Sequence, residues 1–65
     1  MLAKKIRELR LKKKLSQEKL ARLADVSFNT IVKIESGASK NPTFSTMIGI
    51  ARALEISLDE LAKSV

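Results

Sequence analysis

Residues 15–37, LSQEKLARLADVSFNTIVKIESG, contain the pattern that decides the fold. Ser16 is a favourable N-cap for a short helix that runs to about Ala24, and Ser27 is a favourable N-cap for a second helix that runs to about Ser36. The connection between the two is only three residues long. The stretch therefore predicts two short helices joined by a tight turn.

The spacing of small and apolar residues indicates how these two helices pack. Ala21 is small enough for the helices to cross closely, Val26 can plug the turn, and Ile31 can dock the second helix. Gly37 stands where a residue with left-handed backbone ends a helix. This arrangement is a helix-turn-helix over about residues 16–36, a unit that lays its second helix in the major groove of DNA.

Apolar residues recur at helical spacing outside this stretch as well. Three further helices are expected, at about Leu2–Lys14, from a Thr43 cap to Leu54, and from a Ser57 cap to Lys63. The side chains expected to face the core are Leu2, Ile6, Leu9, Leu20, Leu23, Ile31, Ile34, Phe44, Met47, Ile48, Ala51, Leu54, Leu58 and Leu61. No segment alternates as a strand does, so the sequence predicts one compact all-α domain of five helices over residues 1–65.

Two local features of the C-terminal half carry their own predictions. Gly49 interrupts an apolar helix, at a cost of about 1 kcal/mol relative to alanine. We therefore expect Gly49 to allow close packing, with a kink as the alternative. Ser57 and Glu60 have the spacing of a capping box, in which each side chain bonds the other residue's backbone N–H.

The composition excludes several classes of protein. The 65 residues include no Cys and no His, so the usual ligands for zinc, haem or iron–sulfur clusters are missing, and we expect no metal and no cofactor. The carboxylates are dispersed and no nucleophile has an oriented base, so catalytic residues are not expected. No apolar run approaches the ~20 residues of a membrane span, which predicts a soluble, cytoplasmic protein that does not bind membranes.

The positive charge is concentrated in the first half of the chain. Thirteen Lys and Arg against seven Asp and Glu give a net charge of +6, and ten of the thirteen lie in residues 1–33. Such an asymmetry favours an anionic partner on one side of the molecule. The run Lys12–Lys14 fits either a solvated helix end or contacts with a nucleic-acid backbone, and Lys14 is the best placed for the second role.

The ordered set of motifs resembles the Cro/C1-type (XRE-like) helix-turn-helix family, which includes phage repressors and Cro proteins. The matching segments are Leu15–Glu18, Val26–Ser27, Ile31, Ile34–Gly37, Asn41–Pro42, Ile50–Leu54 and Ser57–Leu61. The resemblance covers about Ile6 to Leu61. It implies a lambda-repressor-like DNA-binding fold of five helices.

The resemblance also implies roles for individual residues. Gln17 is similar to the family glutamine that touches the DNA backbone and braces the recognition helix, and Arg10 and Glu35 resemble a pair that ties the first helix to the end of the third. The residues expected to contact the DNA backbone are Lys14, Ser16, Gln17, Lys40 and Asn41. For Gln17, the positive end of a helix is a natural phosphate site.

The residues expected to contact bases lie on the first turns of the recognition helix: Phe28, Asn29, Thr30 and Lys33. Family members often begin this helix with Gln. Phe28 cannot bond adenine but can touch a thymine methyl group, unless it is a partly exposed core residue. Asn29 suits adenine or a phosphate, Thr30 a methyl group or a phosphate, and Lys33 either guanine or the backbone.

Together these patterns predict a sequence-specific transcriptional regulator, a repressor, that binds double-stranded DNA. Family analogy implies a homodimer on a palindromic operator, with half-sites about 10 base pairs or a multiple apart. Ile56, Leu58 and Val65 are candidates for the dimer surface unless they complete the core, and a longer parent protein with its own dimerisation domain is an alternative. The competing function is a protein-interaction module of the same fold, such as an antitoxin-like or coactivator-like adaptor.

Overall fold

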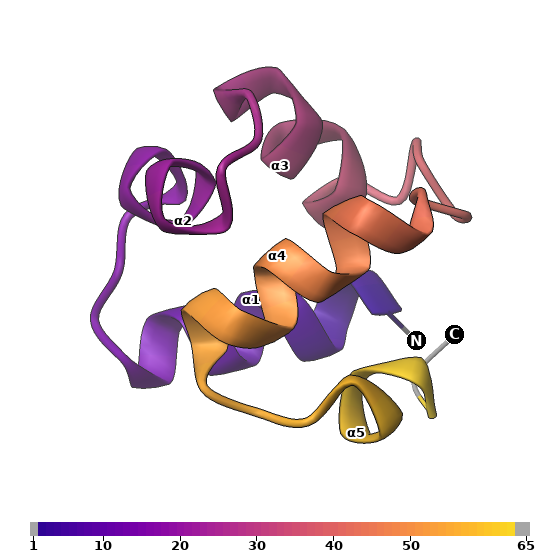
Figure 1. Ribbon diagram of the computed structural model, residues 1–65. Helices are drawn as coiled ribbons and strands as arrows, with labels where there is room; N and C mark the ends of the chain where they lie inside the picture. The colour runs from indigo at the N-terminus through magenta and orange to yellow at the C-terminus, as the bar shows by residue number, and fades with distance from the viewer. Residues whose placement is uncertain (1, 64–65) are drawn as a thin grey trace.

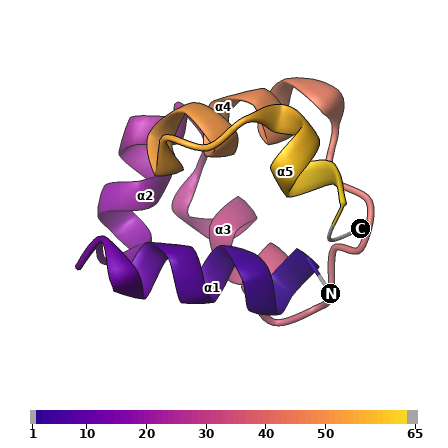
Figure 2. The same ribbon diagram turned by 90° about the horizontal axis from the view of Figure 1, so that it is seen from below.

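The computed structural model describes residues 2–63, and these form five helices with no strand among them (Figure 1). The helices are α1 (Leu2–Lys12), α2 (Gln17–Ala24), α3 (Phe28–Glu35), α4 (Phe44–Leu54) and α5 (Leu58–Ala62). α2 packs against α3 and α4, and α1 packs against α3 and α5. Figure 2 shows α1 and α4 on opposite sides of the molecule, with α2 at one end and α5 at the other. The all-α fold predicted from the sequence is confirmed.

The helix starts are placed by hydroxyl caps, as the sequence predicts. Ser16, Ser27, Thr43 and Ser57 each accept a hydrogen bond from the backbone N–H three residues further on. Each cap satisfies one of the N–H groups that have no partner within the helix. The capping box expected at the start of α5 is formed in its Ser57 half, whereas the Glu60 carboxylate lies 3.7 Å from the Lys5 ammonium of α1.

The first helix is shorter than expected, because it ends at Lys12 and not at Lys14. Lys14 adopts the left-handed conformation, with a φ of 59°. The backbone N–H of Leu15 then donates to the carbonyl of Arg10 at 3.0 Å, which closes the helix end. This left-handed residue turns the chain into α2, and only four residues, 13–16, separate the two helices.

The core is built from aliphatic side chains contributed by all five helices. The largest fully buried ones are Ile6, Leu20, Ile31, Ile34, Ile50, Leu54 and Leu61. Gly49 lies where α4 meets the end of α2, and a Cβ atom there would come within 3.0 Å of the Ala24 carbonyl oxygen. The prediction that Gly49 permits close packing is therefore confirmed.

Three residues expected to face the core lie elsewhere. Leu23 is 49% exposed and Phe44 is 70% exposed, while Ile48 is half-buried. A straight helix buries one stripe, and in α4 that stripe is Met47, Ile50, Ala51 and Leu54. Phe44 begins the helix beyond the end of this stripe. In α2, Ala21 and Ala24 bring the helix close to its neighbours and turn Leu23 outward.

Candidate nucleic-acid interface

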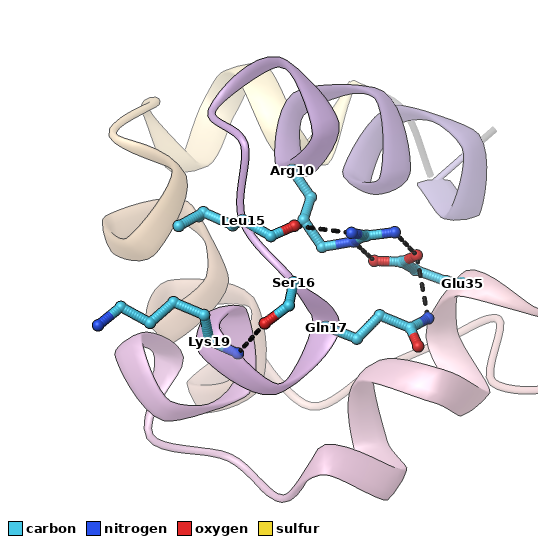
Figure 3. A network of polar contacts seen from close by, with 6 residues as sticks. All are labelled: Arg10, Leu15, Ser16, Gln17, Lys19 and Glu35. Atoms are coloured by element: carbon cyan, nitrogen blue, oxygen red, sulfur yellow. Dashed lines mark hydrogen bonds and ion pairs between the residues drawn. The ribbon is translucent and has the colours of Figure 1, made fainter.

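A buried polar network fixes the start of α2 against α3 (Figure 3). Arg10 of α1 is only 8% exposed, and its Nε and Nη2 donate to the two carboxylate oxygens of Glu35 at 2.7 and 3.0 Å. Its Nη1 donates to the carbonyl of Leu15 at 2.8 Å. The two parallel bonds give the ion pair a defined orientation as well as energy. The pair expected from the sequence is thus present and ties α1 to the last residue of α3.

Gln17, the first residue of α2, joins the same network. Its Nε2 donates to Glu35 Oε1 at 3.2 Å, so the side chain braces α3 from the neighbouring helix (Figure 3). Ser16 Oγ accepts the Lys19 N–H at 3.0 Å, which leaves its own hydroxyl proton as a donor. The first backbone N–H groups of α2 lie at the positive end of the helix dipole. The start of α2 therefore presents donors suited to an anion.

The recognition helix is anchored on one side and exposed on the other. Ile31 and Ile34 are fully buried, whereas Asn29 and Lys33 are exposed and lie four positions apart on the outward face. Phe28, at the helix start, is 48% exposed. α3 therefore presents a fixed outward surface whose first turns carry the residues predicted to read bases.

Thr30 differs from the other predicted base-reading residues because its polar group already has a partner. Its hydroxyl lies 2.8 Å from Ser27 Oγ, and its backbone N–H donates to the same Ser27 oxygen at 3.1 Å. The side chain is half-buried. The N-cap residue of α3 and the Thr30 hydroxyl thus belong to the same small hydrogen-bonded group.

The remaining predicted backbone contacts lie on either side of α3. Lys40 and Asn41 are exposed in the loop that joins α3 to α4, and Lys14 is exposed in the turn before α2. In both ribbon views α3 lies between α2 and this loop (Figures 1 and 2). Gly37 begins the loop with a φ of 85°, in the left-handed region where the sequence placed it.

Sequence reasoning missed Arg7, which lies next to this network. An open pocket of about 330 Å³ is lined by Arg7, Arg10, Gln17, Val32, Glu35 and Ser36. Arg7 is exposed and lies three positions before Arg10 on α1, so its guanidinium faces the same region as the start of α2. The sequence signal that could have identified Arg7 was its spacing from Arg10 along one face of the helix.

Ion pairs neutralise part of the positive charge of α1. Lys13 forms a salt bridge with Glu55 at the end of α4, and Lys5 lies 3.7 Å from Glu60 of α5. The hydrogen bond and the charge of Lys13 lower the pKa of Glu55 below its ordinary value. All three lysines of the run Lys12–Lys14 are exposed, and the middle one forms a surface ion pair with Glu55.

Comparisons with known proteins find similar structures among regulatory proteins. The helix-turn-helix family model matches residues 6–61. The controller protein C.AhdI of a restriction-modification system from Aeromonas hydrophila is 35% identical, with a TM-score of 0.86 over 92% of this chain and 89% of that chain. SinR, a master regulator for biofilm formation solved in complex with DNA, is 26% identical, with a TM-score of 0.90 over 95% and 98%.

A comparison with curated protein sequences finds no match. No helix within residues 2–63 is long and apolar enough to cross a membrane.

Proposed function

The chain belongs to the helix-turn-helix family, of the Cro/C1 (XRE-like) type, and from this premise we propose that it is a sequence-specific DNA-binding transcriptional regulator that acts as a repressor. Its structural neighbours are a restriction-modification controller protein and a biofilm regulator whose structure was solved in complex with DNA. Both neighbours resemble this chain over nearly its whole length.

The single observation that carries the proposal is the two-sided character of α3. Ile31 and Ile34 hold one face in the core, so the opposite face, with Asn29 and Lys33, is presented at a fixed angle. An α-helix of this kind fits the major groove of B-DNA, where base edges carry a distinct pattern for each base pair. Phe28, Asn29, Thr30 and Lys33 are the residues that we assign to base contacts.

Contacts with the DNA backbone supply most of the affinity in this proposal. We assign them to Lys14, Ser16 and Gln17 before and at the start of α2, and to Lys40 and Asn41 in the loop after α3. These two groups lie on opposite sides of α3, so they would hold the helix in register from both sides. Arg7, beside the start of α2, joins the first group.

The protein acts as a homodimer on a palindromic operator in this proposal, with half-sites about 10 base pairs or a multiple apart. Of the residues considered for the dimer surface, Ile56 and Leu58 are half-buried and pack on the core. They have some surface left for a second subunit but already stabilise the monomer. Val65 lies outside the described residues.

A binding assay on duplex DNA tests the proposal directly. The full chain is mixed at low salt with random-sequence duplexes, and bound sequences are then selected and amplified over several rounds. We expect nonspecific binding that weakens steeply with salt, followed by enrichment of a symmetric consensus. Absence of duplex binding at low salt would refute the proposal and favour the protein-interaction module of the same fold.

A further inference from the structure

The first turn of α3 has an apolar character that the rest of the outward face lacks. Phe28 is about half exposed, and it is absent from both the buried cluster and the partly buried side chains that pack on it within residues 2–63. Its ring offers no hydrogen-bond donor or acceptor. In the major groove, the base feature that an apolar side chain recognises is the C5-methyl group of thymine.

Thr30 supports the same interpretation through its bond to the N-cap. Ser27 Oγ lies 2.8 Å from the Thr30 hydroxyl and also accepts the Thr30 N–H. Because the hydroxyl and the methyl group share one Cβ, holding the hydroxyl also fixes the direction of the methyl group. One hydrogen bond holds the hydroxyl, and the methyl group on the same Cβ is the apolar part of Thr30 that can contact a base.

Asn29 lies between these two residues and is the polar member of the turn. Its amide is exposed, and it is the group that pairs with adenine N6 and N7 in the major groove. Every adenine is paired with a thymine. A side chain that bonds adenine and side chains that contact the thymine methyl group therefore both favour a half-site with A·T base pairs. Lys33, one turn further along, carries the only charge among these four residues.

We propose that the first turn of α3 selects thymine through its 5-methyl group, with Phe28 and Thr30 as the specificity-determining residues and Asn29 reading a neighbouring adenine. The inference rests on the proposed function, because it names the bases that the same surface recognises. The operator half-site then contains A·T base pairs at the positions under the start of α3.

Replacing thymine with uracil tests this inference on the unmodified protein, since the two bases differ only by the methyl group. Each thymine of the selected site is replaced in turn, and the dissociation constant is measured in a fixed salt concentration. We expect binding about fourfold weaker at each contacted thymine, the value for one buried methyl group, and no change at the flanking thymines.

Protein variants show which side chain contacts which thymine methyl group. Phe28→Ala should abolish the uracil effect at one thymine, while Phe28→Leu, which keeps an apolar side chain, should retain part of it. Thr30→Ser keeps the bond to Ser27 but loses the methyl group, and it should abolish the effect at another thymine. Thr30→Val keeps a methyl group but loses the bond to Ser27, and it should retain part of the effect.

The outcomes separate this inference from the proposed function. A strong consensus whose half-sites contain only G·C base pairs, or one insensitive to uracil at every position, would overturn the inference and leave DNA recognition standing. A uracil effect that all four variants leave unchanged would also overturn it. If no duplex is bound and no sequence is enriched, both proposals fail.

Discussion

Arg10 and Glu35 lie 25 positions apart in the sequence, yet they form a bidentate ion pair with N–O distances of 2.7 and 3.0 Å. Their side chains are 10% and 4% exposed, so water screens the pair weakly. The pair joins α1 to the end of the recognition helix, and Gln17 attaches α2 to the same carboxylate. The orientation of α3 therefore depends on this one contact more than on any surface ion pair.

Removal of one partner of this pair should be strongly destabilising. For Arg10→Ala we expect a loss of about 3 kcal/mol in the free energy of unfolding, because Glu35 is left charged and buried without its partner. Chemical denaturation followed by circular dichroism measures the loss. Lys5→Ala, which breaks the exposed pair with Glu60, is the matched control and should change stability by less than about 1 kcal/mol. Equal effects of the two variants would contradict this ranking.

Gly49→Ala should destabilise the protein although alanine is the better helix former. Helix propensity alone would favour the variant by about 1 kcal/mol. The new Cβ would come within 3.0 Å of the Ala24 carbonyl oxygen, and forcing α4 away from α2 costs typically ~1–3 kcal/mol. We expect the clash to outweigh the gain in helix propensity, so thermal denaturation should show a net loss of stability. Ser45→Ala, on an exposed position of α4, is the control, and a gain in stability for Gly49→Ala would disprove the close approach.

Lys14→Gly should stabilise the fold. Lys14 has a φ of 59°, a conformation that costs non-glycine residues about 1 kcal/mol and that glycine adopts freely. A change to glycine at Glu8, an exposed position in the middle of α1, should instead cost about 1 kcal/mol through helix propensity. Urea denaturation of the two variants should therefore shift in opposite directions. A loss of stability in both would mean that the turn does not need the left-handed residue.

Glu55 should make stability depend on pH in the acidic range. Lys13 lowers its pKa in the folded state, first through a hydrogen bond and then through its charge. A carboxyl group with a depressed folded pKa contributes stability above its unfolded pKa, and this contribution disappears as the pH falls through the folded pKa. Glu55→Gln should flatten the acid limb of the plot of melting temperature against pH. Superimposable curves for wild type and Glu55→Gln would count against the pairing.

Asn29→Ala and Lys33→Ala should separate base reading from attraction to the DNA backbone. We expect Asn29→Ala to weaken binding to the selected site by about 1–3 kcal/mol while sparing nonspecific duplexes. For Lys33→Ala, the base contact assigned above predicts a salt dependence close to that of the wild type, whereas a phosphate contact would make it shallower by about one unit. Titrations at several salt concentrations measure both. A parallel fall of cognate and nonspecific affinity in Asn29→Ala would make Asn29 a backbone contact.

Some features were readable from the sequence because they depend on neighbours a few residues apart. Ser16, Ser27, Thr43 and Ser57 cap their helices through bonds within one turn, so local chemistry suffices to place them. The burial of Ile31 and Ile34 follows in the same way from the helical period. These local rules predicted five helices, the tight turn and the outward face of the recognition helix.

Tertiary structure decided which face of each helix meets its neighbours and which charges pair across the molecule. Leu23 and Phe44 follow the helical period, but packing on small residues and on the Met47–Leu54 stripe left them exposed. Lys13 and Glu55 lie 42 positions apart, so no local spacing could have linked them. The sequence by itself determined the helices and named the residues that we propose for contact with DNA. Only folding determined the angles between the helices, because long-range contacts decide which apolar side chains of each helix meet a neighbour.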